Sequence, residues 1–363
     1  MKAHVIFISL LSCLAVAFHV NSQVYVYAHG SSHAQTITDS LKASNITFEL
    51  TDTIIKNDVQ NLYIICDAFN LDAHNFPHYY ITYQSLDLTH NQLTNDYFNK
   101  LSNSVAVWDY SFDNINRYRG MLHNYLYMPQ NYAHADPVVL PCRLPVSVLA
   151  TYKELLCYSN QKDTDISSHL PALFAHTILQ NPKIIVEAGV RGGESTKPLY
   201  KATQFCKSNL IGVDIDPMWA KATYNAMDNA FCLEMSDVDF ADYYLNSSFK
   251  DKKIDLVFID TSHEYQHTLQ EITVFVPLLN EHGALMFHDS NVTPLERSGY
   301  VRLNGSWDSA PGNPRGVPQA IKEYFALDFN EYAYSNITFT RNGITWHMTH
   351  YPFCNGLTIM QKQ

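Results

Sequence analysis

Short apolar runs alternate with amphipathic stretches along most of the chain, and this pattern predicts the strands and helices. The N-terminal runs are rich in Val, Ile and Tyr, as β-strands are: QVYVYAH, ITFELTD, NLYIICDAF, HYYITYQSL, SVAVWDYS and NYLYMP. Between them, SHAQTITDSLKAS and LTNDYFNKLSNS carry apolar residues at helical spacing. Strands that alternate with helices build a parallel sheet with crossover helices, so we expect an open α/β domain.

Three prolines in ADPVVLPCRLP interrupt this pattern, because proline can neither continue a helix nor pair within a central strand. Two helices are predicted next, VSVLATYKELLCYS and ISSHLPALFAHTILQ. The alternation then resumes with the strand-like runs KIIVEAG, NLIGVDID, AFCLEM, IDLVFID and GALMFHD. We therefore predict an α/β domain over residues 23–135, a linker with helices over 136–182, and a Rossmann-like, doubly wound α/β domain over 183–363.

The longest apolar run, VIFISLLSCLAVAFHV, lies almost at the start of the chain. A basic start, 16 apolar residues and a polar end are typical of a secretory signal peptide. The run is shorter than the roughly 20 residues of a membrane-spanning helix. We therefore expect residues 1–22 to be a signal peptide and the protein to be secreted or extracytoplasmic. An uncleaved membrane anchor and a buried strand are the alternatives, and without a signal the protein would be cytoplasmic.

The composition excludes some classes of protein. The formal net charge is −11, from 24 Lys and Arg against 35 Asp and Glu, which argues against a nucleic-acid partner because such binding needs a cationic surface. Hydrophobic residues make up 46% and charged residues only 16% of the chain, which suffices for packed cores and excludes disorder for most of it. Whether the chain forms a homo-oligomer stays open.

A glycine-rich turn follows the first strand-like run of the second domain, where an open parallel sheet binds its ligands. The segment VEAGVRGGEST contains Glu187, Gly189, Gly192 and Gly193 directly before a predicted helix. Glycines let the backbone approach a ligand closely, and a helix N-terminus offers free N–H groups. The spacing matches neither GxGxxG nor a P-loop, so it does not favour phosphate binding, and a plain turn is the alternative.

Acidic residues follow the next two runs. Asp214 ends GVDID, where a carboxylate can accept hydrogen bonds from both ribose hydroxyls of an adenosine-containing ligand. Asp237 follows the third run and could bind the exocyclic amine of an adenine, although a solvated turn explains it equally well. These two acids and the glycine-rich turn form a candidate nucleoside site.

The fourth and fifth runs end in FIDTSHEY and MFHDSN, which contain Asp260 and Asp289. If the two strands are neighbours, about 4.8 Å apart, the two carboxylates lie at the same edge. Such a pair indicates a shared proton, a bound cation or both, and hard oxygen ligands suit Mg²⁺. His263 and His288 flank the pair and are candidates for a metal ligand or a general base. Helix caps and core histidines are the structural alternative.

In combination, the segments VEAGVRGGEST, GVDID, DLVFIDTSHEY, VPLLNEHGALMFHDS and RGVPQAIKEYF resemble class I S-adenosylmethionine-dependent methyltransferases. Within that class the chain is most similar to the cephalosporin hydroxylase-like and macrocin O-methyltransferase-like group, over roughly residues 165–325. The resemblance implies that the glycine-rich turn, with Glu187, Gly189 and Gly193, holds the methionine part of S-adenosylmethionine. It also implies that Asp214 binds the ribose and, less specifically, that Asp237 binds the adenine.

The same resemblance assigns Asp260 and Asp289 to a divalent cation. Catechol-type members have Asn directly after the second acid, where this chain has Ser290, and other members have an acid before it, where this chain has His288. The third metal ligand therefore stays open. The implied activity is O-methylation of a hydroxyl on a sugar, a polysaccharide or a polar small molecule, with Asp260 and the cation activating the hydroxyl and His263 or His288 taking its proton.

The N-terminal domain has a looser resemblance to bacterial polysaccharide-biosynthesis proteins related to glycosyltransferases, carried by HYYITYQSLDL, VAVWDYSFDNI and YLYMP. It implies a substrate-recognition or vestigial domain, in which Trp108, Asp109, Tyr110 and Asn114 are candidates for binding a sugar; an ordinary buried strand end is the alternative. Two further functions stay open. One is glycosyl transfer by this domain, and the other is carbohydrate binding by a secreted protein on an inactive methyltransferase scaffold.

Overall fold

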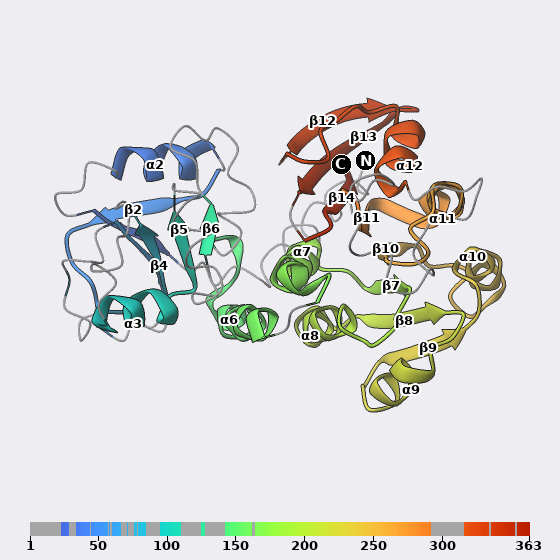
Figure 1. Ribbon diagram of the computed structural model, residues 1–363, viewed down its shortest axis with the longest axis horizontal. Helices are drawn as coiled ribbons and strands as arrows, with labels where there is room; N and C mark the ends of the chain where they lie inside the picture. The colour runs from blue at the N-terminus through green and yellow to red at the C-terminus, as the bar shows by residue number, and fades with distance from the viewer. Residues whose placement is uncertain are drawn as a thin grey trace, which may run out of the picture. The chain divides into compact units, whose positions relative to one another are not determined.

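A computed structural model describes most of the chain after residue 22. The described residues are 23–28, 34–43, 45–56, 58, 60–66, 71, 76–77, 79–84, 95–109, 125–127, 142–161, 164–291, 316–333, 335–352 and 354–363. The expected signal peptide, Tyr110 and Asn114 lie outside them. The chain divides into two compact units, residues 1–150 and 151–363, whose elements Figure 1 labels.

The first unit contains a six-stranded sheet in which every pairing is parallel, as the alternating pattern predicts. The strand order is β2-β1-β3-β4-β5-β6. The strands are β1 (Val24–Tyr27), β2 (Phe48–Thr51), β3 (Leu62–Ile65), β4 (Tyr79–Gln84), β5 (Ala106–Asp109) and β6 (Tyr125–Tyr127). Helices α2 (Ala34–Ala43) and α3 (Asn95–Asn103) lie on opposite faces of the sheet in Figure 1. Trp108 and Asp109 are the last two residues of β5.

The second unit contains an eight-stranded sheet with the order β12-β13-β14-β11-β10-β7-β8-β9. Its strands are β7 (Ile184–Ala188), β8 (Asn209–Asp214), β9 (Ala230–Glu234), β10 (Ile254–Ile259), β11 (Leu279–His288), β12 (Ser335–Arg341), β13 (Ile344–Tyr351) and β14 (Leu357–Lys362). The first five are parallel, and the last three join them in antiparallel pairing. The strand order reverses between β7 and β10, which confirms the predicted doubly wound fold.

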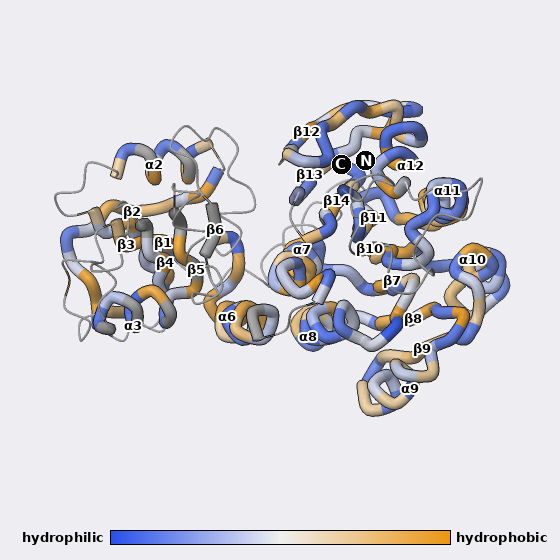
Figure 2. Tube along the Cα trace, in the orientation of Figure 1, coloured by the Kyte–Doolittle hydropathy of each residue, from blue (hydrophilic) through white to orange (hydrophobic). Residues whose placement is uncertain are grey.

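Helices cover both faces of this sheet (Figure 1). They are α7 (Leu170–Gln180), α8 (Thr196–Cys206), α9 (Met218–Asn225), α10 (Asp237–Asn246), α11 (Tyr265–Phe275) and α12 (Val317–Phe325). Helix α6 (Val146–Gln161) contains the boundary between the two units. Alternate residues of β7 face opposite sides, so Val186 packs in a core with α10, α11 and α12, while Ile185 packs in a core with α7, α8 and α9. Figure 2 shows the corresponding hydrophobic colour along β10 and the hydrophilic residues of α11.

The sequence analysis missed the three C-terminal strands, because Asn, Thr and His interrupt their apolar alternation. Strand β14 pairs with β11 from Ala284 to His288 and so fixes the strand that leads to Asp289. Within the described part of the chain, no helix has the length and apolarity needed to cross a membrane.

A buried histidine in β13 makes the stability of this C-terminal region dependent on pH. His350 is fully buried, with Nδ1 2.7 Å from Thr358 Oγ1 and Nε2 2.8 Å from the carbonyl oxygen of Glu331. Burial lowers its pKa to about 4, although the Glu331 carbonyl favours the charged form. A histidine whose pKa falls on folding contributes stability above its unfolded pKa, and this stability is lost as the pH falls toward the folded value.

We therefore expect the free energy of unfolding of the wild type to decrease by up to about 3 kcal/mol from this group as the pH falls from about 6.5 to about 4. His350→Gln has no such group, so its stability should depend less on pH in this window. Urea denaturation of both proteins at several pH values measures the difference. The same pH dependence in both proteins would contradict the assignment.

Candidate functional site

A cavity of about 310 Å³ opens where strands β7, β8, β9 and β10 end, next to the reversal of strand order. Its lining includes three residues predicted for the cofactor and two predicted for chemistry: Gly189, Asp214, Asp237, Asp260 and His263. The fold thus brings together residues that lie up to 74 positions apart in the sequence. Parallel sheets bind ligands at this place, so this cavity is the candidate active site.

The glycine-rich turn approaches the end of β10 so closely that Gly189 has no room for a side chain. Its φ is +82°, and a Cβ there would lie 2.1 Å from the main-chain oxygen of Asp260. Gly193 also has a positive φ, +79°, whereas a Cβ on Gly192 would meet nothing within 4 Å. Gly189 lines the cavity, and neither Gly192 nor Gly193 is among its lining residues. Among the three, the close approach therefore depends on Gly189.

Asp214, the last residue of β8, holds the glycine-rich turn through hydrogen bonds. Its Oδ2 accepts hydrogen bonds from the backbone N–H groups of Val190, at 2.8 Å, and Arg191, at 3.1 Å. Its Oδ1 accepts a third, from the backbone N–H of Asp216 at 2.9 Å. Asp214 also lines the cavity, and a carboxylate has further lone pairs to offer. It can therefore hold the turn and accept hydrogen bonds from a ligand.

The side chain of Glu187 lies on the face of the sheet that α8 and α9 cover. Its fully buried carboxylate accepts hydrogen bonds from Ser195 at 2.6 Å, Thr196 at 2.7 Å and Tyr224 at 2.5 Å, and it is not among the cavity-lining residues. Burial raises its pKa to about 7, against the lowering effect of these hydroxyl donors. Glu187 thus joins β7 to the start of α8 and to α9. The alternation along β7 turns its side chain to that face of the sheet.

Two aspartates and two histidines form a compact cluster at the ends of β10 and β11. These strands are neighbours, as the sequence analysis proposes. His263 lies between the two acids, with Nε2 3.0 Å from Asp260 Oδ1 and Nδ1 2.7 Å from Asp289 Oδ2. His288 Nδ1 lies 3.1 Å from Asp260 Oδ1 and 3.6 Å from Asp289 Oδ1. The four side chains form one network.

The hydrogen-bond partners indicate that both histidines carry a positive charge. Each ring nitrogen of His263 faces a carboxylate, and His288 Nε2 faces the main-chain oxygen of Asp165 at 3.1 Å. Carboxylates and carbonyls only accept hydrogen bonds, so each of these nitrogens is placed to donate. Burial lowers the pKa of both histidines, but the charges of Asp289 and Asp260 outweigh it and raise the values to about 9 for His263 and about 10 for His288.

The pKa of Asp260 shifts in the opposite direction. Burial would raise the pKa of Asp260, yet His288 and His263 hold it well below its usual range. At neutral pH the negative charge of Asp260 therefore lies against two positively charged histidines. Asp260 and His263 line the cavity, whereas His288 is not among its lining residues and has both nitrogens engaged. His288 is thus placed to hold Asp260, and its predicted role as a metal ligand or general base stays a prediction.

The backbone is strained at this cluster. His263 has a φ of +60° and Asp289 a φ of +53°, values that residues other than glycine seldom adopt. Such outliers cost free energy and persist where the surrounding structure enforces them, often at functional sites. No feature of the sequence predicted this conformation, although it directs His263 between the two acids.

The sequence analysis also missed two side chains on α11. His267 lines the cavity, and Glu271, one helical turn further, is fully buried behind it. Both lie close to Asp237, and the three side chains offer ligand-type atoms within 4.8 Å of one another. The spacing of four residues on one helix was the available signal.

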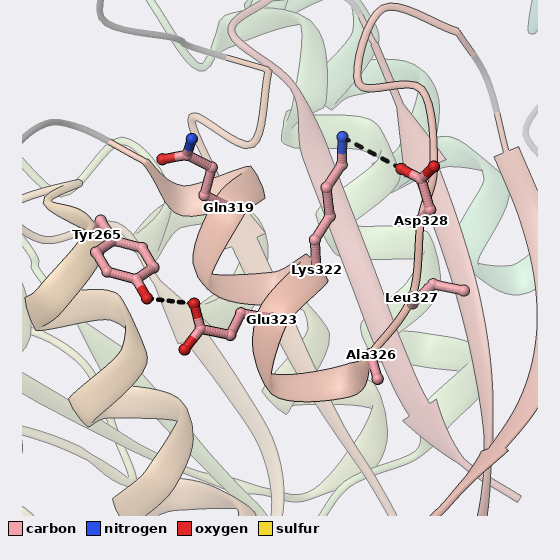
Figure 3. A pocket seen from close by; sticks show the side chains of 7 residues that line it. All are labelled: Tyr265, Gln319, Lys322, Glu323, Ala326, Leu327 and Asp328. Carbon is pink, nitrogen blue, oxygen red and sulfur yellow. Dashed lines mark hydrogen bonds and ion pairs between the residues drawn. The ribbon is translucent and has the colours of Figure 1, made fainter.

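A second hollow, of about 560 Å³, lies against helices α11 and α12 (Figure 3). Four of its polar side chains form two pairs, Lys322 with Asp328 and Tyr265 with Glu323, and Lys322 also contacts Glu331 outside the lining. Lys322 contacts Glu331 at 2.7 Å and Asp328 at 3.8 Å, and the hydroxyl of Tyr265 donates to Glu323. No predicted site residue lines this hollow, so the first cavity is the better candidate for chemistry.

Comparison with known proteins finds a family match within this unit. Residues 186–290 match a protein family described as a methyltransferase domain, a segment that includes Glu187, Asp260 and Asp289. This segment is therefore similar to methyltransferase domains, in agreement with the resemblance seen in the sequence. No curated protein matches the chain.

Solved structures with a similar fold include several methyltransferases. The methyltransferase PaMTH1 of Podospora anserina, bound to S-adenosylhomocysteine, is 16% identical with a TM-score of 0.38, and the match covers 65% of this chain and 98% of that one. The O-methyltransferase TomG of Streptomyces achromogenes is 16% identical with a TM-score of 0.36, over 54% and 80% of the two chains. An O-methyltransferase of Bacillus cereus is 15% identical with a TM-score of 0.36, over 63% and 96%.

Proposed function

We propose that the second unit transfers the methyl group of S-adenosylmethionine to a hydroxyl group of a sugar or another polar small molecule. The observation that carries the proposal is the cavity of this unit, in whose lining Gly189, Asp214 and Asp237 lie together with Asp260 and His263. Gly189 lets the backbone approach the methionine part of the cofactor, and Asp214 and Asp237 accept hydrogen bonds from the ribose and the adenine. Asp260 and His263 lie beside the reacting groups.

The reaction needs alignment and removal of one proton. The acceptor oxygen forms a bond to the methyl carbon while the carbon–sulfur bond of the cofactor breaks, and S-adenosylhomocysteine leaves. Most of the rate enhancement comes from holding the two reactants in line. We propose Asp260 as the acceptor of the hydroxyl proton, because it is the unprotonated group of the cluster that lines the cavity.

The same cluster has a donor set that fits a divalent cation. Asp260, His263 and Asp289 offer ligand atoms that lie within 4.8 Å of one another. Two carboxylates suit Mg²⁺, and the imidazole widens the choice to transition metals. We propose Asp260 and Asp289 as ligands and His263 as the third. A cation bound there would lower the pKa of the acceptor hydroxyl, and His263 would release a proton to become a ligand.

Chelation is the direct test of the cation. We expect methyl transfer by the full-length protein to fall by about tenfold or more after treatment with EDTA, and to recover when Mg²⁺ or Mn²⁺ is added, because the cation activates the hydroxyl. Binding of S-adenosylhomocysteine, measured by calorimetry, should change little. Full activity in the chelated protein, confirmed metal-free by elemental analysis, would show that the cluster works without a cation.

Asp214 provides the test of cofactor binding. Asp214→Ala should lower the affinity for S-adenosylmethionine by about tenfold or more, because it removes the ribose acceptor and releases the turn that carries Val190 and Arg191. Asp228→Asn removes an exposed charge and serves as the control. The measurement is calorimetry together with transfer of labelled methyl groups to a panel of sugars and phenols. Undiminished affinity in Asp214→Ala would contradict the proposed site.

We further propose that the acceptor is a carbohydrate and that residues 1–22 direct the protein out of the cytosol. The apolar N-terminal run supports the second proposal, and the resemblance of the first unit to polysaccharide-biosynthesis proteins supports the first. Because the methyl donor is made in the cytosol, export would favour the alternative of a carbohydrate-binding protein on an inactive scaffold. N-terminal sequencing of the mature protein and mass spectrometry of co-purified small molecules distinguish these possibilities.

A further inference from the structure

Helix α11 contributes two side chains that hold Asp237 at the edge of the cavity. His267 Nε2 lies 2.9 Å from Asp237 Oδ2 and 3.1 Å from Oδ1, so it can donate a hydrogen bond to this carboxylate. Glu271, four residues later, lies 3.7 Å from the same His267 nitrogen through its Oε1. Residues four apart on a helix lie on one face, so both side chains face Asp237, the first residue of α10.

The charges of these three groups differ because their surroundings differ. Burial raises the pKa of Glu271 well above its usual range, and the neighbouring Asp237 raises it further. The neutral form of Glu271 is therefore favoured more than that of an exposed glutamate. Burial would also raise the pKa of Asp237, but hydrogen bonds with His267 and Glu271 lower it to about 2. The result is a charged Asp237 beside the imidazole of His267 and the buried carboxyl group of Glu271.

The network reaches the catalytic end of the cavity through Thr261. The Thr261 hydroxyl donates a 2.7 Å hydrogen bond to Glu271 Oε1, and Thr261 directly follows Asp260 in the chain. Asp237, Thr261 and His267 line the cavity, whereas Glu271 is fully buried behind them. One face of α11 therefore connects the residue expected to bind the purine with the segment that holds the catalytic acid.

A fixed carboxylate at this place would select between purines. A carboxylate only accepts hydrogen bonds, so it pairs with the exocyclic amine of adenine and opposes the carbonyl oxygen that hypoxanthine carries at the same position. Selection of this kind depends on the direction in which the carboxylate points. A carboxylate free to rotate would distinguish the two bases less.

We propose that His267 and Glu271 are positioning residues that orient Asp237 toward the purine of the cofactor and thereby set the preference for an adenine nucleoside. This inference rests on the proposed function, because it takes the cavity to bind S-adenosylmethionine. It adds two residues for which the family resemblance implies no role.

The test compares two ligands that differ only in the purine, S-adenosylhomocysteine and S-inosylhomocysteine, by calorimetry with the full-length protein. The wild type should prefer the adenosyl ligand. His267→Leu removes the donor and should lower this preference by about tenfold, the value of one hydrogen bond to a charged group. His267→Gln keeps a donor and should restore most of the preference. Glu271→Gln keeps a polar group of nearly the same shape that can still accept the hydrogen bond of Thr261, and it should retain the preference. His282→Leu, on the exposed His282, is the control.

The ratio of the two affinities separates positioning from a general structural role. If His267→Leu weakens both ligands equally, His267 supports only the fold and the inference is overturned. A wild type that binds both ligands equally well would also overturn it and leave the methyltransferase proposal intact. A wild type that binds neither ligand would remove the proposed function itself and the inference with it.

Discussion

Gly189→Ala is expected to abolish cofactor binding and to destabilise the second unit. A methyl group at this position would lie 2.1 Å from the main-chain oxygen and 2.7 Å from the carbonyl carbon of Asp260. These are backbone atoms at the end of β10, which cannot rotate away, and the φ of +82° is itself unfavourable for alanine. The turn must therefore move away from the catalytic acid, which distorts the cavity.

Gly192→Ala is the matched control, since it adds the same methyl group three residues later in the same turn. That methyl group would meet nothing within 4 Å, so stability and cofactor affinity should stay close to those of the wild type. Thermal unfolding and calorimetric titration with S-adenosylhomocysteine measure both properties. If Gly189→Ala binds the cofactor as the wild type does, the close approach of the turn to β10 is not a feature of the folded protein.

Asp260→Asn should lower the rate of methyl transfer by about 100-fold or more while leaving cofactor binding largely intact. Asparagine has nearly the same shape but neither charge nor basicity, so it can neither receive a proton nor bind a cation strongly. It also removes the carboxylate that His263 and His288 share, and this should lower the pKa values of both imidazoles.

Asp251→Asn is the control for this change, because Asp251 is an exposed acid just before the opposite end of the same strand. It should leave the rate unchanged. Transfer of a labelled methyl group, measured under single-turnover conditions, separates the chemical step from binding. A rate in Asp260→Asn equal to that of the wild type would exclude this carboxylate from the reaction.

The sequence predicted those parts of the site that depend on strand ends. Asp214, Asp260 and Asp289 follow apolar runs, and in a parallel sheet the carboxyl ends of neighbouring strands meet at one edge, so their proximity followed from the pattern alone. The glycine-rich turn could also be located from the sequence, because it directly follows the apolar run that forms β7. In the first unit, the regular alternation of strand-like and helix-like runs likewise predicted a parallel sheet.

Other features depended on contacts that no local pattern contains. The role of His288 follows from a hydrogen bond to the main-chain oxygen of Asp165, 123 positions earlier in the chain. The position of His263 follows from a strained φ. The side chain of Glu187 points to the face of the sheet that α7, α8 and α9 cover, because alternate residues of β7 point to opposite faces. His267 and Glu271 became visible only when α11 was seen against Asp237.

Calorimetric titration of the full-length wild-type protein with S-adenosylhomocysteine tests most directly whether the cavity at the ends of β7, β8 and β10 binds the methyl donor. We predict saturable binding that Gly192→Ala retains and that Gly189→Ala loses. An absence of binding by the folded wild-type protein, or undiminished binding by Gly189→Ala, would contradict the assignment of this cavity as the cofactor site.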